Sequence, residues 1–154
     1  MVADYSQIEL RVAAFLSQDP FLLGAFTDGA DIHTRVAMQV FHVAEAQVTS
    51  EMRRRAKIIN FGILYGMGST ALAQNLGVSK KDAQIFIDEY KKELPILHEY
   101  LEKILTDVRK EKYTRTFFGR KRNFQKIASP IPFIKAMYER MAIDAPIQGT
   151  AADI

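Results

Sequence analysis

With 154 residues, a hydrophobic fraction of 48% and a charged fraction of 25%, the chain has the size and composition of one globular domain. The absence of cysteine excludes disulfides and thiolate metal sites, and no apolar run is long enough for a membrane span or a secretory signal. The net charge is only +3, which indicates no polyanion partner by itself, and we expect a soluble cytoplasmic protein without a membrane partner.

The spacing of apolar positions predicts a mainly α-helical chain. The expected elements of the first half are a β-like segment at 2–5 and helices at 7–16, 20–28, 31–41 and 50–65. Asp31 and either Thr49 or Ser50 are the expected N-caps of the last two, because their side chains can accept a hydrogen bond from the first helical turn.

The second half is expected to hold three more helices, a hairpin and a final helix. In order these are a short helix at 69–76 ended by Gly77, a helix from the Ser79 cap to Pro95, an amphipathic helix at 96–113, a β-hairpin at 116–123 turning at Gly119, and a helix from about residue 133 onward.

The fourth helix contains the segment RRRAKIINFGILYG, residues 53–66, which puts four cations at the positive end of the helix macrodipole. One face is an apolar core stripe comprising Met52, Ala56, Ile59 and Ile63. The opposite face presents, in order, the side chains of Arg53, Lys57, Phe61 and Tyr65. Cations beside a helix N-terminus can bind phosphate oxygens, and aromatic rings beyond them can pack on a sugar or base. We therefore expect a nucleoside triphosphate on this face.

The alternative for this face is a solvated basic surface with both aromatic rings folded into the core, although the regular spacing favours the nucleotide. Gly62, Gly66 and Gly68 match neither a P-loop nor a dinucleotide-binding fingerprint. We interpret them as close-packing and helix-ending positions.

A second concentration of positive charge runs from Arg109 to Lys126, where Glu111 is the single acid. Such a run indicates a polyanion partner, but a solvated basic face gives the same pattern. Near the N-terminus, the segment DYSQIELR places Asp4 at the end of the β-like segment, where a carboxylate could hold Mg²⁺ or could instead cap the helix that follows.

These segments together resemble the DNA polymerases of family A, the bacterial DNA polymerase I type. Residues 4–11 are similar to motif A of that family, and residues 53–66 are similar to its motif B, on the O helix of the fingers. The segments DIHT (31–34), FFGRKR (117–122) and ERMAIDAPIQGTAAD (139–153) resemble further family segments in the expected order, so the resemblance covers essentially the whole chain.

The resemblance implies template-directed DNA synthesis, in which a deoxynucleotide is transferred from a dNTP to a primer 3′-OH with two Mg²⁺ ions. Asp4 and Lys57 would be catalytic, and Asp4 and the Tyr5 carbonyl would bind metal. The nucleotide site would comprise Gln7, Glu9 (which would exclude a ribose 2′-OH), His33, Arg53, Lys57, Phe61 and Tyr65. The DNA primer–template would be contacted by Tyr65, Arg120, Arg122, Arg140 and Gln148.

The resemblance also implies a division of the chain. A palm fragment with motif A would occupy 1–18, the fingers 19–134 with the O-like helix at 50–65, and the start of a helix returning to the palm 135–154. We therefore expect a truncated piece of a right-hand polymerase from a bacterial or phage-infected cell, with helical fingers, a small hairpin and a palm-strand fragment, partnered by the rest of the palm and the thumb. Because one carboxylate cannot hold a metal pair, the piece alone is expected to be inactive.

The alternative from another class is a non-catalytic helical module that binds nucleic acid through the basic run 109–126. A third possibility is a truncated product with no activity. Substituting Lys57 distinguishes the first two, because only a polymerase should lose triphosphate binding while keeping most of its DNA affinity.

Overall fold

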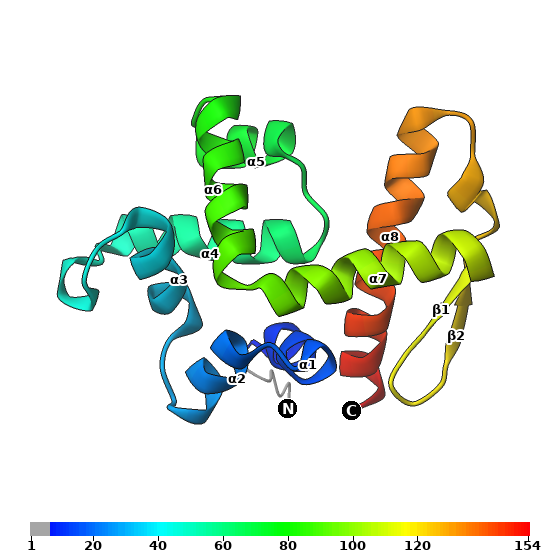
Figure 1. The fold of residues 1–154 in the computed structure, drawn as a ribbon, viewed down its shortest axis with the longest axis horizontal. Helices are drawn as coiled ribbons and strands as arrows, with labels where there is room; N and C mark the ends of the chain where they lie inside the picture. Colours follow the sequence, from blue (N-terminus) through cyan, green and yellow to red (C-terminus); the bar gives the residue numbers. More distant parts are fainter. Residues whose placement is uncertain (1–6) are drawn as a thin grey trace, which may run out of the picture.

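The computed structural model describes residues 7–154, and that range is predominantly helical (Figure 1). The helices are α1 (Ile8–Ser17), α2 (Pro20–Thr27), α3 (Ile32–Phe41), α4 (Ser50–Leu64), α5 (Ser69–Leu76), α6 (Lys80–Glu93), α7 (Pro95–Glu111) and α8 (Pro132–Asp153). An antiparallel hairpin joins β1 (Tyr113–Arg115) to β2 (Lys121–Asn123), and the short 3-10 turns are η1 (Glu45–Gln47) and η2 (Gln125–Ala128). The predicted class, mainly α with a small hairpin, is confirmed; the β-like segment at 2–5 lies outside the described residues.

Helix α7 lies across the middle of the molecule, with α4, α5 and α6 on one side and α1 and α2 on the other (Figure 1). Helix α3 packs on α4, α5 packs on α6, and α8 packs on both α1 and α7. The hairpin follows the C-terminal end of α7 and contacts α8. Within residues 7–154, no helix has the length and apolar character needed to cross a membrane.

Two hydrophobic clusters hold these elements together. The larger one gathers buried side chains from α1 to α7 and, from α8, Ile143 and Ile147. The smaller one lies where α7, η2 and α8 meet and comprises Val108, Phe124, Ile127, Ala142 and Ala145. Helix α8 therefore contributes to both clusters.

The predicted helix boundaries follow the local capping chemistry. Asp31 accepts a hydrogen bond from the Thr34 amide at 2.9 Å, Thr49 from Met52 at 3.2 Å, and Ser79 from Asp82 at 3.0 Å. One detail differs from the sequence prediction: the hairpin pairing begins at Tyr113 rather than at Thr116, because Tyr113 pairs with Asn123. The final helix, predicted from about residue 133 onward, runs from Pro132 to Asp153 and contains Pro146.

Asp19 has no solvent exposure and accepts hydrogen bonds from two helix N-termini. Its Oδ1 accepts from the Phe21 amide at 3.0 Å and the Leu22 amide at 3.3 Å, which caps α2. Its Oδ2 accepts from the Leu97 amide at 3.0 Å, in the first turn of α7, where the adjacent cap residue Leu94 supplies no side-chain bond. One buried carboxylate thus satisfies donors of two helices whose positive ends meet there.

Candidate functional site

Helix α4 has the two faces that its sequence predicts. Ala56, Ile59 and Ile63 are buried, and Met52 is half-buried against the same core. On the opposite face, the side chains of Arg53 and Lys57 are exposed and those of Phe61 and Tyr65 are half-buried. The basic residues therefore lie toward solvent at the start of the helix, and the aromatic rings lie near its end.

The arginines at the start of α4 have carboxylate partners within the chain. Arg53 donates to both oxygens of Asp31, from Nε at 2.8 Å and from Nη2 at 3.0 Å. Arg54 and Arg55 both bond Glu51, one turn earlier. Burial alone would raise the pKa of Asp31, but the hydrogen bonds from Arg53 and Thr34 lower it to about 2. Asp31 is therefore a carboxylate at neutral pH and holds the Arg53 guanidinium beside α3.

Lys57, Phe61 and Tyr65 border a hollow of about 290 Å³ between α4 and α5, whose wall also includes Gly62 and Asn75. The Phe61 and Tyr65 rings are stacked, with centroids 6.0 Å apart and an interplanar angle of 22°. Within residues 7–154, Lys57 has no carboxylate within ion-pair distance. This arrangement places an uncompensated cation next to a flat aromatic surface.

His33 is buried in α3 and contacts two residues of α4. Its Nδ1 lies 3.0 Å from the Asn60 side-chain nitrogen, within hydrogen-bond distance, and its ring centroid lies 5.8 Å from that of Phe61. Burial lowers the pKa of His33, with Arg53 and Lys57 adding to the effect and Asp31 opposing it. The imidazole is therefore neutral at pH 7. Sequence reasoning missed Asn60, whose signal was a polar residue inside the apolar run IINFG.

The end of α4 is linked to α1 through Tyr65 and Glu9. The Tyr65 hydroxyl donates a hydrogen bond to Glu9, in the first turn of α1. Burial, followed by this bond and the Glu9 charge, raises the pKa of Tyr65, so the phenol stays protonated. Gln7 stands immediately before α1 with φ 57° and is half-buried.

Gly66 brings the end of α4 against α8. Its φ is +69°, and a Cβ there would lie 3.2 Å from Ile143 Cδ1 and 3.3 Å from Arg140 Cγ. Arg140 and Gln148 are both exposed on α8, and Gln148 lies near the Tyr65 hydroxyl, where it partly opposes the rise in the Tyr65 pKa. The structure thus places these two predicted residues on the side of α8 that meets Tyr65.

Asp144 is the second carboxylate of this region and was not among the predicted site residues. Its Oδ1 is buried and has no hydrogen-bond partner among the described residues. Burial and then the charge of Glu9 raise the pKa of Asp144 to about 6, while Arg122 and Arg140 oppose the rise. The carboxyl therefore changes its charge in mildly acidic solution.

Replacing Asp144 with Asn should change the free energy of unfolding more favourably at pH 8 than at pH 4. Because the folded-state pKa is above the ordinary 3.8, the wild type loses stability as pH rises from about 4 to 6 and does not regain it above that range. Solvent screens part of the penalty, so we expect a gain of about 1 kcal/mol. Urea unfolding at the two pH values measures it, and an equal difference at both would contradict the assignment.

The hairpin lies beside α8 and carries the other two predicted DNA-contacting residues. Arg122 is exposed, and its guanidinium lies 5.3 Å from the centroid of the Phe124 ring. Arg120 is an exposed residue too, but it donates to Gly149 O and pairs with Asp153, both at 2.9 Å. At the start of the basic run, Arg109 pairs with Glu139 at 2.7 Å. Part of the positive charge seen in the sequence is therefore neutralised within the chain.

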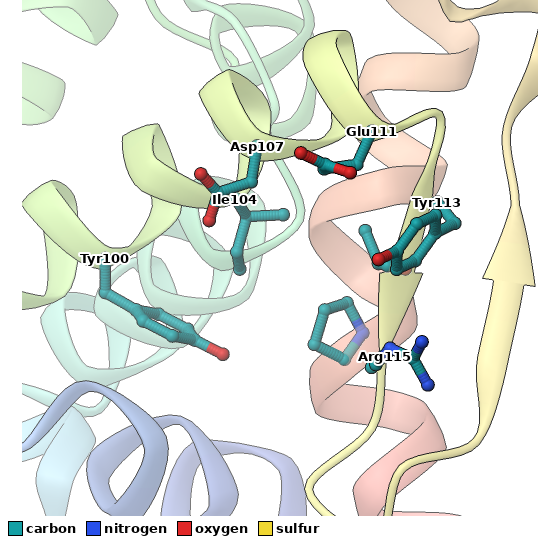
Figure 2. Close-up of a pocket in the computed structure, with 8 residues that line it drawn as sticks. Tyr100, Ile104, Asp107, Glu111, Tyr113 and Arg115 are labelled. Carbon is teal, nitrogen blue, oxygen red and sulfur yellow. The ribbon is translucent and has the colours of Figure 1, made fainter.

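A separate cavity of about 420 Å³ opens between α7, β1 and α8 (Figure 2). Its wall carries the side chains of Tyr100, Ile104, Asp107, Glu111, Tyr113, Thr114, Arg115 and Pro146. None of the predicted site residues lines it.

The predicted residues thus fall into three neighbouring groups. His33, Arg53, Lys57 and Phe61 lie on α3 and α4; Glu9, Tyr65, Arg140 and Gln148 lie where α1, α4 and α8 meet; Arg120 and Arg122 lie on the hairpin. The predicted metal ligands Asp4 and Tyr5 lie outside the described residues. Among residues 7–154, no three His, Asp or Glu side chains are grouped closely enough to hold a metal ion.

Comparison with known proteins gives matches along the whole chain. The sequence model of DNA polymerase family A matches residues 1–154. DNA polymerase I of Bacillus subtilis (strain 168) is 47% identical over 152 residues, and the thermostable DNA polymerase I of Thermus filiformis is 45% identical over 154 residues. These alignments cover 99% and 100% of this chain but 17% and 18% of the relatives, so the chain spans about a sixth of their length.

A solved structure has the same fold. The POL domain of Pol1 from M. smegmatis, in complex with DNA primer-template and dNTP, superimposes with a TM-score of 0.92 and is 40% identical in sequence. The match covers 97% of this chain and 26% of that chain.

Proposed function

This chain belongs to DNA polymerase family A, and we propose that the whole protein is a template-directed DNA polymerase in which the chain supplies the nucleotide-binding surface. Such an enzyme transfers a deoxynucleotide from a dNTP to the 3′-OH of a primer. The observation that carries the proposal is the face of α4, where Lys57, which has no carboxylate partner among residues 7–154, and the stacked rings of Phe61 and Tyr65 border one hollow. The presence of dNTP in the M. smegmatis complex supports it.

On this proposal the triphosphate lies at the start of the α4 face. Lys57 contributes a cation, and Arg53 contributes a second one that Asp31 holds in place. His33, which is neutral and bonded at Nδ1 by Asn60, can donate from Nε2 to a phosphate oxygen. The sugar and base then pack on Phe61. Glu9 and Gln7, at the start of α1, lie on the sugar side, where Glu9 would exclude a ribose 2′-OH.

The primer–template occupies the surface formed by α8 and the hairpin. Tyr65, Arg140 and Gln148 lie together there, and Arg122 adds a cation from the hairpin for phosphate contact. In this arrangement a palm fragment comprises residues 1–18, the fingers comprise residues 19–134, and residues 135–154 begin the helix that returns to the palm.

The polymerases of this family use divalent metal ions, and we propose Mg²⁺ held in part by Asp4 and the Tyr5 carbonyl. The residues that the structure describes do not form a metal site on their own, and the carboxylate of Glu9 already accepts a bond from Tyr65. The chain by itself is accordingly expected to extend no primer.

The pairing of Arg109 with Glu139 and of Arg120 with Asp153 favours this proposal over a simple basic binding module. Primer extension by the full-length protein, with a defined template, four dNTPs and Mg²⁺, tests it. We expect products whose sequence follows the template. A protein that binds the primer–template but incorporates no dNTP would support the binding module instead.

A further inference from the structure

The tip of the hairpin is fastened to the last two turns of α8 by hydrogen bonds and an ion pair between the two elements. Asp153 uses both of its carboxylate oxygens: Oδ1 pairs with Arg120 at 2.9 Å, and Oδ2 accepts from the Thr116 hydroxyl at 2.8 Å. The Arg120 guanidinium also donates to Gly149 O at 2.9 Å, and the Phe117 amide donates to the buried Thr150 hydroxyl at 2.9 Å.

The same contact is closely packed. A Cβ added at Gly149 would lie 2.6 Å from the Thr116 methyl group, so α8 can approach the hairpin this closely only with glycine at that position. Within the turn, Thr116 accepts from the Gly119 amide at 3.0 Å, and its hydroxyl accepts from the Arg120 amide at 3.2 Å. The turn therefore presents Thr116 and Arg120 to Asp153 as one rigid unit.

Two predicted DNA-contacting residues lie beside this fastening. Arg122 on β2 and Gln148 on α8 line one groove of about 220 Å³ between the hairpin and the helix. Each strand has only three residues, and an isolated two-stranded hairpin is at best marginally stable in water. Without a contact to α8, nothing in the hairpin itself would keep Arg122 opposite Gln148.

We infer that Asp153 is a positioning residue: it holds the hairpin on α8 so that Arg122 and Gln148 face the primer–template together. The inference rests on the proposed polymerase function. It also changes the role of Arg120, which the sequence predicted to contact DNA. Arg120 instead acts as the cation of the fastening.

The test is the affinity of the full-length protein carrying Asp153→Asn for a primer–template. Two interpretations of Asp153 predict opposite changes in this affinity. If Asp153 were only an acid on a basic surface, removing its charge would free Arg120 and tighten DNA binding. If it positions the hairpin, the loss of charge-assisted bonds weakens binding, by about tenfold. Unchanged or tighter binding overturns the inference.

Two further readouts separate positioning from general damage. The KM for dNTP, measured at saturating DNA, should stay within about twofold of wild type, because none of the bonds of the fastening involves a residue of α3 or α4. A parallel rise in KM would mean that the substitution disturbs the whole fold, and it would overturn the positioning role. Asp107→Asn, which removes an exposed acid of α7 paired with Lys103, is the matched control and should not weaken DNA binding.

A double-mutant cycle and hydrogen exchange complete the experiment. Thr116→Val, which keeps the side-chain shape but removes the hydroxyl, should add little to Asp153→Asn, since both break the same contact. Exchange of the Phe117 amide should accelerate in Asp153→Asn whether or not the wild type extends primers. Failure of the wild type to extend primers would count against the polymerase function alone, whereas a protected Phe117 amide in the variant would count against the fastening alone.

Discussion

Replacing Lys57 with alanine in the full-length protein is expected to lower kcat/KM for dNTP incorporation by at least about 100-fold. Lys57 is the cation on the α4 face without a carboxylate partner among residues 7–154, and it borders the hollow next to Phe61. A positive group already oriented toward the phosphates stabilises the charge that develops during transfer, and such a contribution is lost with the side chain.

The measurement is single-nucleotide incorporation under steady-state conditions, with DNA affinity determined separately. Arg54→Ala is the matched control: it also removes one cation from the start of α4, but Arg54 is bonded to Glu51 and borders no part of the hollow. We expect the control to retain activity within about threefold. Equal losses in both variants, or a loss of DNA affinity with unchanged dNTP kinetics, would favour a general electrostatic role.

Replacing Asp19 with alanine is expected to lower the free energy of unfolding by about 3 kcal/mol. The substitution removes the N-cap of α2, a loss of about 1 kcal/mol, and leaves the buried Leu97 amide of α7 without an acceptor, a further loss of about 1–3 kcal/mol. Both effects act together because one side chain with no solvent exposure serves both helices.

Urea unfolding at pH 7, followed by circular dichroism, gives the change in stability. Asp28→Ala removes an exposed acid at the other end of α2 and should change the free energy of unfolding by no more than about 0.5 kcal/mol. The loss in free energy of unfolding for Asp19→Asn should lie between the losses for Asp19→Ala and Asp28→Ala. The amide oxygen of Asn can still cap α2, but its amide nitrogen would face the Leu97 donor. A loss below about 1 kcal/mol for Asp19→Ala would contradict the double-cap role.

The helix starts at Asp31, Thr49 and Ser79 could be predicted from sequence because each cap bonds an amide three residues away. The second role of Asp19 could not, since its partner Leu97 is 78 residues distant and becomes a neighbour only when α2 and α7 pack. Local sequence pattern therefore predicts where helices begin. Tertiary packing decides which side chain accepts hydrogen bonds from the first-turn amides of a helix whose own cap residue has no acceptor.

The same limit applies to the candidate site. The periodicity of α4 correctly separated its buried face from the face of Arg53, Lys57, Phe61 and Tyr65. It did not reveal that Asp31 binds Arg53, because that pair depends on how α3 lies against α4. Charge counted along the basic run likewise treated Arg120 as free, although its partner Asp153 lies on another element.

Helix α8 is packed on several sides, which limits the substitutions that it can accept. Ile143 and Ile147 enter the larger cluster, Ala142 and Ala145 enter the smaller one, and the last turns carry the hairpin. A typical surface helix has one whole face exposed to solvent and free to vary, whereas α8 contacts the larger cluster, the smaller cluster and the hairpin on different sides. Side-chain volume is therefore the main constraint on substitutions in this helix, and enlarging Ala142 or Ala145 would push α8 away from α7 and η2.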